Sequence, residues 1–154
     1  MPESDPTNDV RLDPRLIPAR TGVVLCDLQN DVSRGSGPFY NERAIQVRER
    51  RVIENGVRLV KGARKAGVTI FFITVVRRPD YADVVNQLTE FVATGKAVPS
   101  KQQISLLQGT RGAELVEELR PQQSDCVLVK KRRSAFHATA LDLYLRARDI
   151  NTLI

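Results

Sequence analysis

Two uninterrupted apolar runs constrain the fold more than any other feature of the sequence. The run at 21–29 stays apolar until Asp27, and the run at 68–76 is rich in β-branched and aromatic residues. Such runs predict strands buried on both faces, as in a parallel sheet covered by helices. The segment between them, 41–66, has apolar residues at helical spacing and is followed by Gly67, which favours one long amphipathic helix ending there.

The alternation of helices and strands continues along the rest of the chain. We expect short helices at 81–92 and 112–121, a third strand at 125–131, a helix at 139–149 and the opening of a fourth strand at 150–154. Strands that alternate with helices predict a three-layer α-β-α fold with a mostly parallel, Rossmann-like sheet.

Composition argues against several classes of protein. No apolar run approaches the roughly 18 residues that span a bilayer, so a membrane segment is not expected. Residues 1–20 hold four prolines and lack the pattern of a secretory signal, which indicates an arm before a domain at 21–154 and a cytoplasmic location. The net charge of +6 is interleaved with acidic residues, apart from a basic cluster at 130–133 without aromatic platforms, so nucleic acid is not an expected partner.

The two cysteines lie in apolar runs rather than in a disulfide or metal-binding pattern. Cys26 falls in the first strand and Cys126 at the start of the third. We expect both to be reduced, buried thiols, and we expect neither a metal nor a cofactor.

Polar residues at the ends of the strands are the candidates for function. In open parallel sheets, ligands bind in the crevice outside the carboxyl ends of the strands. The two arginines among the candidates could hold a substrate carboxylate, although solvated arginines in a turn are the favoured interpretation. The candidates are Asp27, Gln29, Arg77, Arg78 and Lys130.

Three segments together resemble the isochorismatase-like (cysteine hydrolase) family. In the last of them a strand ends in Lys130, Ser-Ala-Phe follows at 134–136, and Thr139 opens the next helix. In the first, Asp27 stands at the position of the family's acid. The resembling segments are VVLCDLQND at 23–31, VIENGVRLVKGARKAGVTIFFITVV at 52–76 and the stretch 127–154.

The resemblance implies hydrolysis of a C–N bond in a small molecule. A cysteine attacks the substrate carbon, Asp27 takes the thiol proton, and Lys130 supports both charges. That cysteine is expected after the fourth strand, beyond Ile154, so the domain is expected to be incomplete and the 154-residue chain inactive on amides by itself. The candidate substrate-binding residues are Gln29, Arg77, Phe136 and His137, although for His137 a packing or surface role is the favoured interpretation.

Neither cysteine of the chain is expected to replace the missing nucleophile. Successive side chains of a strand point to opposite faces, so Cys26 should face away from its neighbour Asp27. Cys126 precedes Lys130 by four residues, roughly 13 Å along a strand, which places it near the wrong end of the sheet.

The sequence departs from the family pattern at several positions, so other functions of the chain remain possible interpretations. Arg133 replaces a common aromatic residue, Ala140 a common Asp, and Asp149 the glycine that often ends the helix. No histidine follows the second strand as in the zinc-binding nicotinamidases of this superfamily. The alternatives are a non-catalytic binding or assembly module, a cysteine-less vinyl ether hydrolase, and an Asp27–Lys130 ion pair without chemistry.

Self-association is expected as well. The region 84–107 carries more apolar groups than one core accommodates, and the family it resembles is multimeric. These residues are Val84, Val85, Leu88, Phe91, Val92, Ile104, Leu106 and Leu107.

Overall fold

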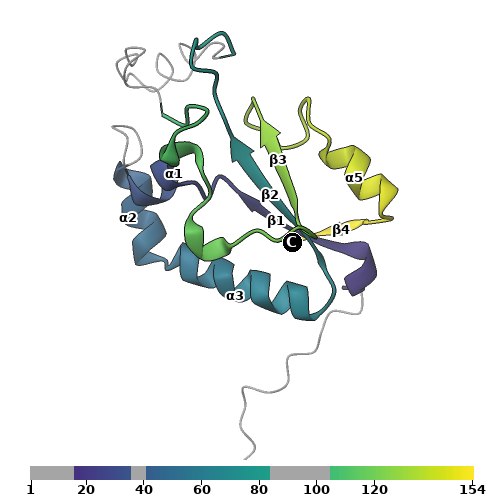
Figure 1. Cartoon of the computed structure of the whole chain (residues 1–154). Helices are drawn as coiled ribbons and strands as arrows, with labels where there is room; N and C mark the ends of the chain where they lie inside the picture. The colour runs from purple at the N-terminus through teal and green to yellow at the C-terminus, as the bar shows by residue number, and fades with distance from the viewer. Residues whose placement is uncertain (1–15, 36–40, 84–104) are drawn as a thin grey trace, which may run out of the picture.

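A four-stranded parallel sheet forms the centre of the molecule. The computed structural model describes residues 16–35, 41–83 and 105–154. Its strands are β1 (Thr21–Cys26), β2 (Thr69–Val75), β3 (Cys126–Lys130) and β4 (Thr152–Leu153). They lie in the order β3-β2-β1-β4 (Figure 1), and each neighbouring pair is parallel.

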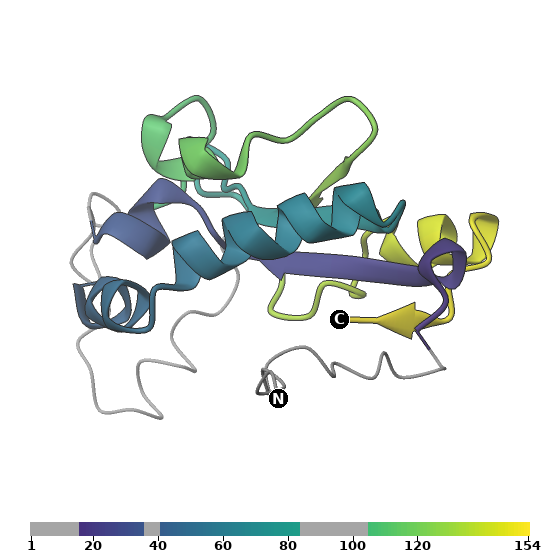
Figure 2. The same cartoon turned by 90° about the horizontal axis from the view of Figure 1, so that it is seen from below.

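Helices cover both faces of this sheet, as Figures 1 and 2 show. The α-helices are α1 (Asn30–Arg34), α2 (Asn41–Glu49), α3 (Val52–Lys65) and α5 (Leu141–Ala147). Short 3₁₀ turns are η1 (Pro18–Arg20), η3 (Arg111–Ala113) and η4 (Glu117–Leu119). The predicted three-layer α-β-α fold with a parallel sheet is therefore confirmed.

Successive side chains of the strands point to opposite faces of the sheet and contribute to two apolar cores. On the α3 side, Leu25 and Phe72 pack with Val60 of α3 and with Leu119. The core on the α5 side contains Phe71, Ile73, Cys126, Leu141, Leu145 and Ile150. Strands that contribute to cores on both faces must be apolar throughout, which explains the two uninterrupted runs in the sequence.

Close approach between strands requires a glycine at position 22. A Cβ added at Gly22 would lie 3.0 Å from Leu153 and 3.1 Å from Phe71. At helix ends, Gly67 adopts the expected left-handed conformation, and so does Asp149, which stands where the family often has glycine.

The predicted single helix over 41–66 is wrong, because the chain divides it into α2 and α3. Arg51 between them adopts a left-handed conformation with φ 51°, and the side-chain amide of Asn55 donates to the Arg50 carbonyl at 3.2 Å. The break turns α2 toward α1 while α3 stays on the sheet. Packing against two different partners thus overrides local helical periodicity.

The helix predicted over 112–121 is also wrong. The segment forms η3 and η4 with an extended stretch between them, in which Leu115 bridges to Gln29. Between its local 3₁₀ bonds, the segment bonds to the loop after β1, through the Val116 N–H to the Leu28 carbonyl and the Asn30 N–H to the Glu114 carbonyl, both at 3.0 Å. Hydrogen bonds to a segment distant in the sequence therefore take the place of α-helical hydrogen bonds here.

Several other predictions fall wholly or partly outside the described residues. Of the helix expected at 81–92, only 81–83 are described, and they form no helix. Of the apolar region 84–107, Leu106 is buried and Leu107 half-buried, while 84–104 are not described. In the described part of the chain, no helix has both the length and the apolar character needed to cross a membrane.

Helix α5 provides a matched test of the packing. Leu141 is fully buried beneath it, whereas Leu143 on the same helix is 67% exposed. We predict that Leu141→Ala lowers the free energy of unfolding by about 2 to 5 kcal/mol, since it removes buried methyl groups and leaves a cavity. Leu143→Ala should change it by no more than about 0.5 kcal/mol. Urea unfolding of both variants measures this, and equal losses would contradict the packing described.

Candidate active site

Asp27 stands where β1 leaves the sheet. Its backbone N–H still donates to the Ile73 carbonyl at 2.8 Å, but its φ of 60° is left-handed. This conformation ends the strict alternation of side chains along the strand. The Asp27 carboxylate is therefore placed at the carboxyl edge of the sheet, in the crevice where parallel sheets bind ligands.

Lys130 reaches Asp27 from the last position of β3. It points to the α5 side of the sheet with Cys126 and Leu128, and its side chain is only 7% exposed. The ammonium Nζ donates to Asp27 Oδ2 at 3.0 Å and to the Arg133 carbonyl at 3.0 Å. The structure thus brings together two residues that are 103 positions apart in the sequence, as expected from the strand ends.

The pair is arranged so that one carboxylate oxygen remains available. Burying an ammonium group is costly unless it is paired and hydrogen-bonded, which Asp27 and the Arg133 carbonyl accomplish for Lys130. The second oxygen, Asp27 Oδ1, is buried and has no hydrogen-bond partner among the residues that the structure describes. An unpartnered acceptor of this kind beside a fixed cation can receive a proton from a bound group.

Gln29 holds the turn that presents Asp27. Gln29 is fully buried, and its side-chain amide bonds to both backbone groups of Val75. The Val75 N–H donates to Gln29 Oε1 at 2.7 Å, and Gln29 Nε2 donates to the Val75 carbonyl at 2.8 Å. Nε2 also donates to the Ala113 carbonyl at 2.5 Å. The amide therefore bonds to the β2 backbone in place of the β1 backbone, which has left the sheet at this point. Both polar groups of the Gln29 side chain are used in these bonds, so neither is available to a substrate.

Asn30 and Asp31 extend this anchoring to the segment before η4. The Asn30 side chain donates to the Arg111 carbonyl at 2.9 Å, and the Leu106 N–H donates to Asp31 Oδ2 at 2.8 Å. Gly112 is required beside Asp31, because a Cβ there would collide with the Asp31 carboxylate. The sequence analysis missed these two residues, although a polar Gln-Asn-Asp run directly after a buried strand was the available signal.

The expectation that both cysteines are buried is wrong for Cys26. Cys126 is buried, but Cys26 is exposed, and both are free thiols. Cys26 lies on the α5 side of the sheet, the side to which Lys130 points, so alternation does not separate it from the site. Partial burial nevertheless raises the pKa of the Cys26 thiol, while Lys130 lowers it and Asp27 raises it. A raised thiol pKa disfavours the nucleophilic thiolate.

The two arginines after β2 contact nearby protein groups. Arg77 bridges to Leu107, and its guanidinium donates to the Ser105 carbonyl at 3.3 Å. Arg78 forms a bidentate pair with Asp80 at 2.9 and 2.6 Å, which lowers the pKa of the Asp80 carboxyl and raises that of Arg78. Both arginines therefore already hold partners at this end of the sheet.

The loop after Lys130 presents the remaining candidates. Phe136 is 53% exposed and His137 is exposed. The Phe136 N–H donates to Ser134 Oγ at 3.2 Å, so Ser134 helps to fix this loop. Thr139 lies just before α5, and its hydroxyl accepts from the Leu141 N–H at 3.2 Å. Among the described residues, no group of three or more His, Cys, Asp or Glu side chains is placed to hold a metal ion.

Comparison with known proteins defines the class of this site. The model of the isochorismatase domain matches residues 21–154. Ureidoacrylate amidohydrolase RutB of Agrobacterium fabrum is 30% identical over 146 residues, covering 90% of this chain and 64% of its own length. RutB of a Methylorubrum extorquens strain is 36% identical over 109 residues, which are 67% of this chain and 44% of that protein.

The solved structures agree with the sequence relatives. The crystal structure of a cysteine hydrolase from Pseudomonas syringae pv. phaseolicola superposes with a TM-score of 0.66 and 27% identity, covering 90% of this chain and 59% of that one. The chain belongs to the isochorismatase family. It spans 44% to 64% of the length of the two curated relatives described above.

The role of Gln29 generates a prediction with a defined pH dependence. In Gln29→Glu, a carboxylate oxygen replaces the Nε2 donor and faces the Val75 and Ala113 carbonyls. The folded-state pKa of the new acid is then raised above its unfolded value of ~4.3, because only the protonated form can donate. We predict a loss of about 3 kcal/mol of unfolding free energy at pH 7, with the difference from the parent shrinking as the pH falls toward ~4.3.

Exposed Gln108 supplies the matched control. Gln108→Glu should change the unfolding free energy little at any pH. Urea unfolding of parent and variants at several pH values measures the differences. A pH-independent loss in Gln29→Glu would show that the amide does not act as the donor described.

Proposed function

We propose that this protein hydrolyses a C–N bond of the amide or ureido type in a small molecule. The observation that carries the proposal is the 3.0 Å contact between Lys130 Nζ and Asp27 Oδ2, with Asp27 Oδ1 left buried and unpartnered. A fixed cation beside an available carboxylate oxygen suits proton abstraction from a nucleophile. Membership of the isochorismatase family and similarity to proteins named ureidoacrylate amidohydrolase support the reaction type.

In the proposed mechanism, the nucleophile is a cysteine outside residues 1–154. Asp27 accepts the thiol proton, and the thiolate attacks the substrate carbonyl carbon to give a tetrahedral intermediate. The C–N bond then breaks as protonated Asp27 returns the proton to the leaving nitrogen. Water, deprotonated by Asp27, then hydrolyses the acyl-enzyme, which is a thioester from an amide and a thiocarbamate from a ureido substrate. The products are the free thiol and, respectively, a carboxylic acid or a carbamic acid that loses CO₂.

Lys130 has an electrostatic role in this scheme. Its ammonium stabilises the thiolate form of the attacking cysteine and attracts the negative charge that develops on the carbonyl oxygen. Phe136 and His137 lie in the loop that follows Lys130 and are both exposed, so they are the proposed substrate contacts of that loop. Gln29 is proposed to act on the substrate indirectly, since the described contacts occupy its side-chain amide. Arg77, whose guanidinium has one described bond, to the Ser105 carbonyl, is proposed to contact the substrate.

The first test of the function concerns the charged pair. The parent protein in these tests includes the proposed nucleophilic cysteine outside residues 1–154. We predict that Asp27→Asn and Lys130→Met each lower its kcat for hydrolysis of a ureido acid by about 10²- to 10⁴-fold, the usual value of a positioned proton-transfer group or of a group that stabilises developing charge. Asp142→Asn is the control, since Asp142 is an exposed residue of α5 paired with Arg146. Ammonia release measures the rate, and circular dichroism verifies that each variant is folded. Unchanged rates in folded variants would contradict the assignment.

The second test concerns the nucleophile. We predict that the double variant Cys26→Ser, Cys126→Ser retains the activity of the parent and remains sensitive to iodoacetamide, because the attacking thiol lies elsewhere. Loss of activity in the double variant would place the nucleophile within this chain. Full activity that iodoacetamide leaves intact would favour a cysteine-less reaction, such as vinyl ether hydrolysis. Absence of turnover in the parent with every ureido and amide substrate would favour a binding or assembly module.

We also propose that the protein forms homo-oligomers in the cytoplasm. Val127 and Val129 of the edge strand β3 are 49% and 45% exposed on one side of the sheet. Among the described residues no strand pairs with the outer side of β3, and apolar side chains at such an edge favour association with another chain. A monomeric mass by light scattering at tens of micromolar protein would contradict this proposal.

A further inference from the structure

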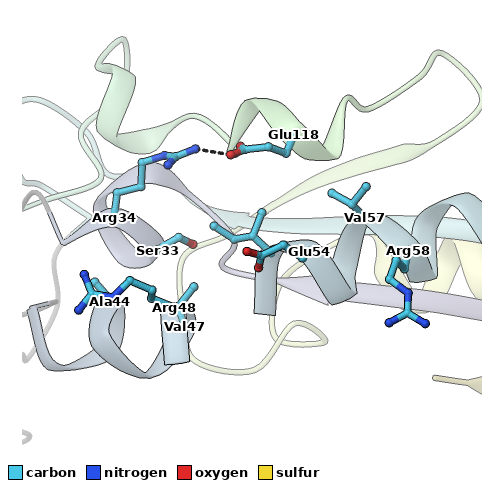
Figure 3. A pocket seen from close by; sticks show the side chains of 10 residues that line it. Ser33, Arg34, Ala44, Val47, Arg48, Glu54, Val57, Arg58 and Glu118 are labelled. Carbon is cyan, nitrogen blue, oxygen red and sulfur yellow. Dashed lines mark hydrogen bonds and ion pairs between the residues drawn. The ribbon is translucent and has the colours of Figure 1, made fainter. Parts of the chain in front are cut away.

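A cavity lies on the α3 side of the sheet, whereas Lys130 of the charged pair points to the α5 side. It has a volume of about 620 Å³ and is formed by α1, α2, α3 and η4 (Figure 3). None of its lining residues belongs to the pair or to the loop after β3. It is therefore separate from the candidate active site.

One wall of the cavity holds a buried hydroxyl without a partner. Ser33 of α1 is 5% exposed, and its Oγ makes no hydrogen bond within the described part of the chain. Figure 3 shows the Ser33 hydroxyl directed toward the space in front of α3. Most buried hydroxyl groups are satisfied by protein or water, so an unsatisfied one on a cavity wall points to a polar group of a ligand.

The floor of the cavity is apolar. Ala44 and Val47 of α2 are half-buried there, and so are Ile53 and Val57 of α3. Ile53 and Val57 also pack against the core on the α3 side. Such a floor suits an alkyl or aromatic part of a ligand, since ligand cavities are mostly apolar with a few placed polar groups.

The charges around the cavity leave an excess of positive charge. Arg34 Nη2 and Glu118 Oε1 pair at 2.6 Å across one side. The remaining charged lining residues are Arg48, Arg58 and Glu54, and within the described ranges their side chains have no ion-pair or hydrogen-bond partner. Two cations against one anion favour an anionic ligand.

We propose that this cavity binds a small amphipathic monocarboxylate. The apolar part of the ligand lies on the floor made by α2 and α3. Its carboxylate accepts a hydrogen bond from Ser33 Oγ, and the positive charge of Arg48 and Arg58 attracts it. This single ligand satisfies the unpartnered hydroxyl, covers the apolar floor and balances the excess charge.

Octanoate is the probe for a titration of the whole protein by ligand-observed NMR and calorimetry. At ordinary ligand efficiency its ten heavy atoms correspond to a Kd of about several millimolar or below. We predict saturable binding at one site, weaker binding of octan-1-ol, and none of octylammonium. Failure of octanoate to saturate, or equal binding of octylammonium, would overturn the proposal.

Variants of the lining identify the site independently of any catalytic activity. We predict that Ser33→Ala weakens octanoate binding about tenfold without destabilising the ligand-free protein, because it deletes an unpaired hydroxyl from a helix. Arg48→Gln and Arg58→Gln should each weaken binding, whereas Glu54→Gln should strengthen it by removing repulsion.

The control is Lys61→Gln, an exposed cation of α3 outside the lining, which should leave the Kd unchanged. If Lys61→Gln weakens binding as much as Arg48→Gln does, the effect is one of net charge, and the proposed site is wrong. The same conclusion follows if Ser33→Ala leaves the Kd unchanged.

Discussion

The sheet ladder completed by the Gln29 side chain is the interaction on which the rest of the site depends. β1 must leave the sheet at Asp27 for its carboxylate to reach Lys130, and a departing strand exposes the backbone groups of its neighbour. The Gln29 amide satisfies both groups of Val75 and reaches across to Ala113. One fully buried side chain therefore ties the carboxyl ends of two strands to the segment before η4 and fixes the left-handed turn that presents the acid.

Much of this arrangement could be predicted from the sequence, because burial on both faces leaves an unmistakable apolar pattern. Parallel strands bring their carboxyl ends to one edge, so Asp27 and Lys130 had to converge once their strands were identified. Resemblance to the isochorismatase-like family, confirmed by the comparisons, gave the two residues their proposed roles. Asp149 could also be understood in advance, since its left-handed backbone is one that aspartate tolerates.

The errors arose where tertiary contacts override local pattern. The helical segment is interrupted at Arg51, where the sequence has no glycine or proline that would predict an interruption. The interruption follows from the different packing partners of α2 and α3. The stretch 112–121 is rich in helix formers, yet its backbone bonds to the loop after β1. Cys26 illustrates the limit of strand alternation, which holds only while the backbone remains extended and fails at the turn into Asp27.

The central claim is that the Asp27–Lys130 pair is where the substrate reacts. It is tested most directly by a crystal structure of the Asp27→Asn protein, made slow to turn over, with a ureido acid bound. We predict that the carbonyl oxygen of the bound ligand lies within hydrogen-bond distance of Lys130 Nζ, on the α5 side of the sheet beside the loop at Phe136. A ligand bound elsewhere, without contact to Lys130, would contradict the claim that the substrate reacts at the Asp27–Lys130 pair.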